Sequence, residues 1–307
     1  MTDLANAASD YLRIRRALGF KLTDQGRLLN SFIDHMQSLG AVTVTTERAL
    51  AWATQPAHAD PVWWSARLGV VRGFARYLQS LDPSAEVPPA GLLPDRNHRT
   101  TPYIYSQAEI AALLRAARQL SRPLRAATYE TLFGLLATTG MRIGEATVVD
   151  QGDIDFDLGL LTIHHGKFNK ARIVPLHPST LQALHNYSQR RRELCPGAKH
   201  PSFFVSSNGS RLTPTNADKA FGQLLGACGV QWAPRQQRPR PHDLRHTFAV
   251  RTMIGWYRDG ADVQERMPLL STYLGHANPD ATYWYLTAVP ELLALAAQRL
   301  EVAGGKP

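Results

Sequence analysis

Residues 129–146 read YETLFGLLATTGMRIGEA and predict a buried helix that breaks at a glycine just before an arginine. Apolar side chains occur nearly all round YETLFGLLATTG, which is typical of a helix enclosed by other elements. Arg142 follows the break at Gly140 and falls in the first turn of a new helix, where free backbone N–H groups favour an anion. Arg142 is therefore a candidate phosphate ligand. The alternative is an i,i+3 ion pair between Arg142 and Glu145 on a solvated face.

The flanking sequence predicts further helices and one β-hairpin. Residues 153–165, DIDFDLGLLTIHH, alternate or are rich in β-formers, GKFN can turn, and KARIVPL returns as a second strand. Upstream, SQAEIAALLRAA begins with a capping box of Ser106 and Glu109. Helix-like segments lie near 178–193 and 214–228, and more follow the basic loop RQQRPRP. The expected fold class is mainly α with a small β-sheet (α+β).

The N-terminal 80 residues predict a separate helical bundle. Apolar positions recur at spacings of three and four in YLRIRRALGF and in RLLNSFIDHMQSLG. Residues 86–101, EVPPAGLLPDRNHRTT, are dense in proline, glycine and polar side chains, which favour neither helix nor strand. We therefore expect a helical domain at 1–85, a linker at 86–104 and a second domain at 105–307.

Charge points to a polyanionic partner, with nucleic acid as the first candidate. The 307 residues hold 34 Lys and Arg against 25 Asp and Glu, a net charge of +9. Residues 1–98 hold 10 basic and 9 acidic side chains, so residues 99–307 carry the remaining +8. The second domain is therefore the expected site of nucleic-acid binding.

The cysteine and hydropathy patterns predict a cytoplasmic protein. Cys195 and Cys228 are the only cysteines and have no CxxC spacing, which supports neither a disulfide framework nor a thiolate zinc site. No apolar run approaches the roughly 18 residues that span a bilayer, and MTDLANAASD lacks the order of a signal peptide.

Two further stretches hold cationic or titratable side chains. HHGKFNKARIVPL places Lys167 or Lys170 at a hairpin tip, where a lysine can point into a cleft or only into solvent. PRPHDLRHTFAVR places His242, Arg245 and His246 on one face of a helix. The two histidines have the spacing of a zinc-protease helix, but an aspartate replaces the general-base glutamate and Arg245 would put a cation beside the metal. No metal site is expected there.

Residues 274–286, LGHANPDATYWYL, contain His276 and two tyrosines, Tyr283 and Tyr285, on one short predicted helix. A tyrosine is either a packing residue or a nucleophile. Farther upstream, Asp150, Asp153, Asp155 and Asp157 do not form a calcium loop, because Leu158 and His164 stand where that loop needs glycine and glutamate.

Taken together, these side chains suit a phosphodiester. Arg142 and Arg245 can hold its nonbridging oxygens, as magnesium does in other enzymes. A tyrosine can attack the phosphorus once a histidine takes its proton, and a lysine can protonate the departing 5′ oxygen. The product is a DNA 3′-phosphotyrosine that can be rejoined without ATP, in keeping with the lack of a GxxxxGK[ST] phosphate loop.

In this order, the motifs resemble the tyrosine recombinase or phage integrase family, which includes the Xer recombinases, Cre and lambda integrase. The resemblance covers residues 105–290. It implies that GKFNK supplies Lys167 rather than Lys170, and that LGH supplies His276. Because the family nucleophile lies nine residues after that histidine, it implies Tyr285, with Tyr283 about 200° away around the helix and packed elsewhere. The implied catalytic set is Arg142, Lys167, His242, Arg245, His276 and Tyr285, with either His242 or His276 taking the tyrosine proton.

The resemblance also implies the partners. The two domains are expected to close around double-stranded DNA as a C-shaped clamp, as a homotetramer on synapsed sites that can include sister recombinases, and without cofactor or metal. Candidate contacts to the DNA backbone are Arg190, Arg191, Arg192, Arg235, Arg238 and Arg240.

Departures from the family pattern concern the hairpin tip and the C-terminal part. Phe168 replaces the usual small glycine of the lysine motif, and the segment between HDLRH and LGH is longer than in compact Xer-like members. The longer segment, together with TYWYL, favours a transposon-encoded enzyme. The apolar stretch PELLALAAQRL predicts a last helix that docks on a neighbouring protomer or packs within the chain.

Three alternatives remain open from the sequence. A type IB topoisomerase-like enzyme would form the same intermediate, an inert DNA-binding protein would act beside sister recombinases, and a metal hydrolase would need a chelatable ion.

Overall fold

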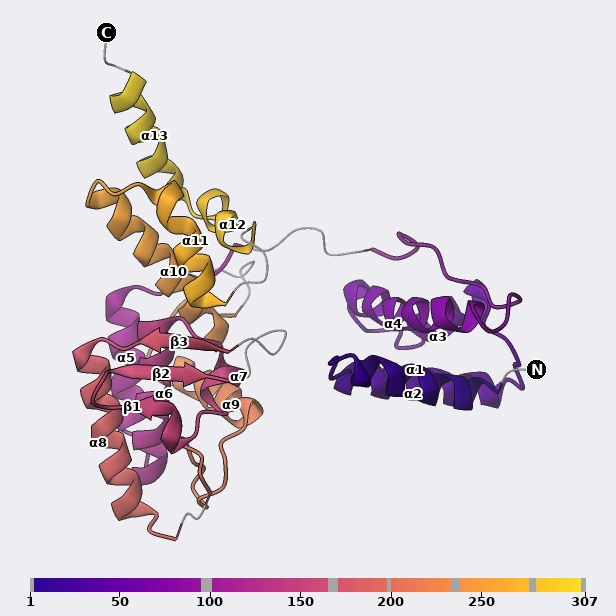
Figure 1. Cartoon of the computed structure of the whole chain (residues 1–307), viewed down its shortest axis with the longest axis horizontal. Coiled ribbons are helices and arrows are strands. Elements are labelled where there is room, and N and C mark those ends of the chain that lie inside the picture. The colour runs from indigo at the N-terminus through magenta and orange to yellow at the C-terminus, as the bar shows by residue number, and fades with distance from the viewer. Residues whose placement is uncertain are drawn as a thin grey trace. The chain divides into compact units, whose positions relative to one another are not determined.

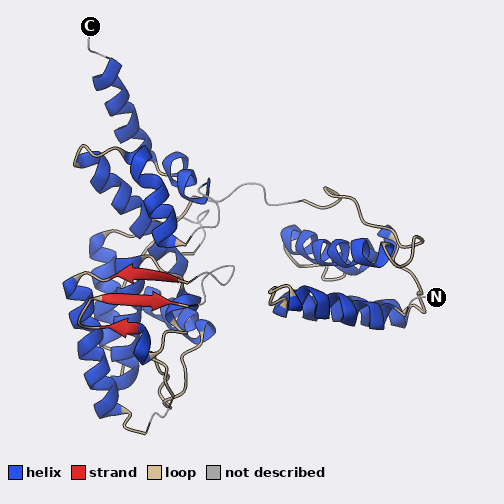
Figure 2. Cartoon of the chain, in the orientation of Figure 1, coloured by secondary structure: helices blue, strands red, loops and turns tan. Residues whose placement is uncertain are grey.

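The computed structural model describes residues 3–94, 101–164, 171–197, 200–232, 238–275 and 280–304. The chain divides into two compact units, Met1–Arg99 and Thr100–Pro307. Helices dominate both, and a three-stranded sheet lies in the second (Figure 2). The expected fold class, mainly α with a small β-sheet, is confirmed. None of the helices in the described ranges has the length and apolar character needed to cross a membrane.

The first unit is a helical bundle around an aromatic core. Phe32 and Trp52 meet edge to face with ring centroids 5.3 Å apart, and the guanidinium of Arg67 stacks over the Trp52 ring at 3.8 Å. Both rings are buried, so apolar burial holds the bundle together. The helices of this unit are α1 (Leu4–Ala17), α2 (Thr23–Ser38), α3 (Thr46–Thr54) and α4 (Pro61–Gln79) (Figure 1).

The segment after α4 packs back on this bundle. The backbone N–H of Glu86 donates to the carbonyl of Val44 at 2.9 Å, and Arg72 donates to the carbonyls of Pro88 and Pro89, both at 2.8 Å. Part of the expected linker is thus attached to the first unit. The domain boundaries at 85 and 104 stay a prediction.

In the second unit, helices pack against one face of the sheet, and a further helical group lies toward the C-terminus (Figure 1). The capping box of Ser106 and Glu109 opens its first helix as the sequence predicts, with bonds of 2.7 and 3.1 Å. The helices are α5 (Gln107–Arg118), α6 (Pro123–Thr139), α7 (Ile143–Ala146), the 3₁₀ helix η1 (Gln151–Asp153), α8 (Pro178–Leu194), α9 (Pro214–Ala227), α10 (Pro241–Arg258), α11 (Val263–Leu274), α12 (Asp280–Ala288) and α13 (Pro290–Gly304) (Figure 1).

The sheet has three strands where the sequence predicted a two-stranded hairpin. The strands β1 (Ile154–Asp155), β2 (Leu160–Ile163) and β3 (Arg172–Pro175) are antiparallel in the order β1-β2-β3. The expected first strand is split by a turn, because the Asp155 carboxylate accepts the N–H groups of Asp157 and Leu158 at 3.0 and 2.8 Å. Gly159 completes this turn with a φ of 67°.

Two glycines bring distant helices to the same place. Gly140 ends α6 with a φ of 61°, and a Cβ there would lie 2.6 Å from the Phe248 ring of α10. Gly275 ends α11 with a φ of 67°. Both positions need glycine for the left-handed backbone. The ends of α6 and α11 therefore meet beside α10, where the candidate site lies.

Candidate active site

Arg142 is the residue that precedes α7 and is held by a buried carboxylate. Its Nη1 donates to Oε1 of Glu145 at 2.8 Å, its backbone N–H donates to Oε2 at 2.9 Å, and its Nη2 donates to the carbonyl of Gly275 at 3.0 Å. The Glu145 side chain is 5% exposed and that of Arg142 is 25% exposed. The alternative ion pair thus exists but is buried rather than solvated, and Arg142 keeps an accessible edge.

Arg245, on α10, is almost entirely enclosed. It is 2% exposed, and its Nη1 and Nη2 donate to the carbonyls of Gly140 at 2.9 Å and Leu274 at 2.7 Å. Burial and then the charge of Arg142 lower its pKa to about 10, which leaves it cationic at neutral pH. These bonds use two of the five guanidinium N–H groups.

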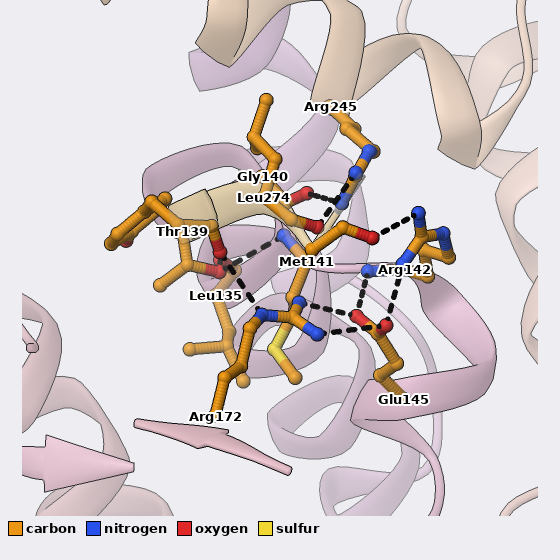
Figure 3. Close-up of polar contacts among 11 residues, drawn as sticks. Leu135, Thr139, Gly140, Met141, Arg142, Glu145, Arg172, Arg245 and Leu274 are labelled. Carbon is orange, nitrogen blue, oxygen red and sulfur yellow. Dashed lines mark hydrogen bonds and ion pairs between the residues drawn. The ribbon is translucent and has the colours of Figure 1, made fainter. Parts of the chain in front are cut away.

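A third arginine, Arg172 on β3, joins this group (Figure 3). Its Nη2 and Nη1 donate to the two carboxylate oxygens of Glu145 at 2.8 and 3.1 Å, and its Nε donates to the carbonyl of Tyr273 at 3.0 Å. A Cβ at Gly275 would lie 2.8 Å from its Nη1. The guanidinium therefore packs directly against the backbone that ends α11.

Three successive carbonyls at the end of α11 each accept a different arginine. Tyr273, Leu274 and Gly275 accept Arg172, Arg245 and Arg142 in that order. The last carbonyls of a helix lack partners within the helix, and the helix dipole makes this end negative. Cations from three distant parts of the chain are thus drawn to one point.

Glu145 supplies the other anionic partner of these cations. Burial alone would raise the pKa of its carboxyl, but hydrogen bonds and charge from Arg172 and Arg142 hold that pKa down at about 2. Glu145 is therefore ionised at neutral pH. It neutralises part of the positive charge and fixes the direction of both guanidinium groups.

His242, on the first turn of α10, lies beside the arginines as a neutral ring. Its side chain keeps a solvent-exposed edge, yet desolvation by the surrounding protein and the charges of Arg245 and Arg142 lower its pKa to about 4. At neutral pH the ring is uncharged, so it can donate one hydrogen bond and accept another.

The hydroxyl of Tyr285 reaches the same helix. Its Oη lies 2.7 Å from Nδ1 of His246, and the residue is 2% exposed. It is close enough to Arg245 that the phenolate charge would raise the pKa of that arginine. His246 in turn meets the His242 ring edge to face, with centroids 4.7 Å apart. The Tyr285 hydroxyl is therefore linked through His246 to His242 and lies close to Arg245, two of the predicted catalytic residues on α10.

The two tyrosines of α12 differ in surroundings, but not in the way the sequence predicted for Tyr283. Tyr283 is 39% exposed, so the expectation that it packs is wrong. The core of this region is instead filled from the opposite face of α12, by Tyr285 and Thr282. Because Tyr283 lies about 200° from Tyr285 around the helix, its side chain faces away from the core as well as from the arginines.

Of the six predicted catalytic residues, the structure brings Arg142, His242, Arg245 and Tyr285 together. Lys167 and His276, and also Phe168 of the hairpin tip, lie outside the described residues. His276 directly follows the Gly275 that the arginines hold.

One of the expected DNA contacts is wrong. Arg191 is 4% exposed and its Nη2 donates to the carbonyl of His200 at 3.1 Å, because it stands on the inner face of α8 beside Tyr187 and Leu184. Arg190, Arg192, Arg238 and Arg240 are exposed, and Arg235 lies outside the described residues.

Sequence reasoning missed the roles of Arg172 and His246 and the burial of Glu145. A signal existed for Arg172, because strand alternation puts it on the same face as the buried Val174, and an inward arginine needs a carboxylate. His246 was placed on the face of His242 and Arg245, but only the fold shows that α12 packs against that face.

Comparisons with known proteins show the family of this chain. The model of the phage integrase family matches residues 104–291. The protein called "Putative integrase/recombinase y4rB" of Sinorhizobium fredii is 43% identical over 307 residues, which cover 98% of each chain. The structure of the Tn1549 transposon integrase with transposon right end DNA has a TM-score of 0.66 at 17% identity and covers 96% of this chain and 99% of that one. The structure of the XerH site-specific recombinase bound to palindromic difH substrate has a TM-score of 0.63 at 20% identity, with 90% and 77% covered.

The chain therefore belongs to the phage integrase family, the tyrosine-type site-specific recombinases. The y4rB protein matches it along nearly the whole length, including the N-terminal helical unit.

Proposed function

We propose that the protein cuts and rejoins DNA at specific sites, with Tyr285 as the nucleophile and a 3′-phosphotyrosyl intermediate. The observation that carries this proposal is the convergence of Arg142, Arg245 and the Tyr285 hydroxyl around α10. The fold already holds these two guanidinium groups in position, so they can stabilise the pentacoordinate transition state, whose nonbridging oxygens carry more negative charge than those of the ground state. Neither ATP nor a metal ion has a part in this mechanism.

Each residue has a separate task in the cleavage step. Arg142 and Arg245 hold the nonbridging oxygens, and the neutral His242 donates a hydrogen bond to one of them. The Oη of Tyr285 gives its proton to a neighbouring histidine and forms a bond to phosphorus while the bond from phosphorus to the 5′ oxygen breaks. Lys167 gives a proton to that departing oxygen, and His276 assists at the phosphate. Rejoining reverses these events with a 5′-hydroxyl as the nucleophile.

The assembly proposed for this reaction follows from the family. The chain binds double-stranded DNA, and four copies act on two synapsed sites, alone or with sister recombinases. The net charge of +8 on residues 99–307 supports DNA binding there. The resemblance to the fold of a transposon integrase supports a role in a mobile element. Free cysteines at 195 and 228 suit the cytoplasm.

A nicked suicide DNA substrate tests the function. It should trap a protein–DNA adduct that survives denaturation, in the presence of chelator, with the wild-type chain and not with Tyr285→Phe. An adduct that persists in Tyr285→Phe would contradict the assignment of the nucleophile. If no adduct forms on the ends of the encoding element, the chain is an inert DNA-binding protein. Relaxation of plasmid without exchange between two duplexes would favour the topoisomerase-like alternative.

A further inference from the structure

We propose that His246 is a catalytic residue, which takes the proton from Tyr285 as the tyrosine attacks DNA. This inference rests on the function proposed above. Nδ1 of His246 and Oη of Tyr285 are 2.7 Å apart, within the range for direct proton transfer. In the tautomer that this role requires, neutral His246 carries its own proton on Nε2, so that Nδ1 accepts the hydrogen bond from the phenol.

The electrostatic surroundings favour His246 over its neighbour for this task. Described ionisable groups near it include His242 and Arg245 on the same helix, Tyr285 on α12 and, beyond Arg245, Arg142 and Glu145. A pKa near 4 makes His242 a weak base, since the arginines oppose its protonation. His242 also stays neutral, so it adds no charge that would repel a protonated His246 at a centroid distance of 4.7 Å.

The proton and electrons balance within this arrangement. The O–H bond of Tyr285 breaks and its proton moves to Nδ1 of His246, while the oxygen electron pair forms the bond to phosphorus. The bond to the 5′ oxygen breaks, and that oxygen is protonated by Lys167, the general acid proposed above. The developing phenolate lies between the guanidinium of Arg245 and the new imidazolium, which both stabilise it. In rejoining, the imidazolium returns its proton to the departing phenolate.

The variant His246→Asn distinguishes a general base from a residue that only accepts a hydrogen bond. The asparagine amide oxygen can accept the phenol hydrogen bond near the place of Nδ1, but an amide does not take up a proton. The adduct-forming rate of His246→Asn on the suicide substrate should fall about 10²- to 10⁴-fold, the usual contribution of general base catalysis. His185→Asn, an exposed histidine change on α8, is the matched control and should keep the wild-type rate.

A substrate with sulfur in place of the bridging 5′ oxygen distinguishes the base from the acid. A thiolate leaves without protonation, so this substrate should restore the rate of Lys167→Ala but leave His246→Asn slow. The rate of His246→Asn should also rise tenfold per pH unit from pH 6 to 9, as hydroxide replaces the lost base, while the wild-type rate levels off.

Three results would overturn the inference. They are a wild-type rate in His246→Asn, a faster rate, which would mean that the contact restrains the tyrosine, and restoration of His246→Asn by the sulfur substrate. The far-ultraviolet circular dichroism of the variant verifies folding, and an Asn variant that fails to fold is replaced by His246→Gln. If the wild-type chain forms no adduct, the proposed function fails instead, so the two failures are distinct.

Discussion

Replacing Glu145 by glutamine should destabilise the second unit, Thr100–Pro307, which is here called the catalytic unit, to a degree that depends on pH. The change removes the buried carboxylate charge that pairs with both Arg142 and Arg172, each of which has a guanidinium nitrogen 2.8 Å from a carboxylate oxygen. The carboxyl has a pKa of about 2 in place of 4.5, and at about 1.36 kcal/mol per pH unit this difference corresponds to about 3 kcal/mol. Loss of one partner from a buried ion pair has a similar cost of about 3–5 kcal/mol.

The sign of the pH dependence follows from the lowered pKa. Stabilisation by Glu145 is complete above the unfolded pKa near 4.5 and is lost as pH falls through the folded value near 2. Above pH 5 the variant should melt about 6–12 °C below the wild-type chain, for a unit of roughly 200 residues. Less than half of the difference in free energy should remain by about pH 3.

Differential scanning calorimetry of the full-length chain between pH 7 and pH 3 measures this difference in the transition of the catalytic unit. Glu291→Gln is the matched control, because Glu291 pairs with Arg258 at 3.1 Å with both side chains more than half exposed. That change should shift the transition by less than about 2 °C. Equal melting of wild-type and Glu145→Gln chains, or a gap that stays constant down to pH 3, would refute the reasoning.

Three further predictions concern the nucleophile, the buried arginine and the end of α11. Tyr285→Phe should lower adduct formation on the suicide substrate by at least about 10⁴-fold, while Tyr283→Phe, at an exposed position, should stay within about twofold of the wild-type rate; equal loss in both would remove the distinction. Arg245→Lys should cost about 1–3 kcal/mol of unfolding free energy, because a compact ammonium does not reproduce the two guanidinium hydrogen bonds to the carbonyls of Gly140 and Leu274. It should also slow cleavage about 10²- to 10³-fold in single-turnover assays. A wild-type cleavage rate would contradict the place of Arg245 at the phosphate. Gly275→Ala should reduce both the melting temperature and the cleavage rate, because the new Cβ would lie 2.8 Å from the Arg172 guanidinium. Gly260→Ala is the control, since Gly260 has a similar φ of 73° but open space around it. That change should cost only about 1–2 kcal/mol of backbone strain and leave the cleavage rate unchanged. Similar cleavage losses in the two glycine variants would show that the arginine contact has no role.

Local sequence signals predicted the elements well where one segment determines its own structure. The capping box at Ser106 forms, Gly140 ends a helix that is buried on most sides, and Pro241 opens α10. The exception is the turn within residues 153–163. There Asp155 and Gly159 favour a turn as strongly as the flanking apolar residues favour a strand, so alternation alone misplaced the boundary.

The residue types at the candidate site came from the sequence, since a phosphodiester reaction without metal needs cations, proton carriers and a nucleophile. Arg142, His242 and Arg245 were found in this way, the family resemblance selected Tyr285 over Tyr283, and the structure places all four in one region. Lys167 and His276 stay predictions. The exposure of Tyr283 and the burial of Arg191 could not be read from spacing, because both depend on which face of a helix meets a neighbour.

The sequence by itself determined which helices form, where glycine ends them and which side chains can do the chemistry, because these depend on neighbours within one or two turns. The tertiary structure decided that Arg142, Arg172 and Arg245 share one helix end, that the first two also share one carboxylate, and that His246 meets Tyr285. Such contacts depend on how the helices pack, and a guanidinium enters a low-dielectric interior only where its anionic partners have already been assembled.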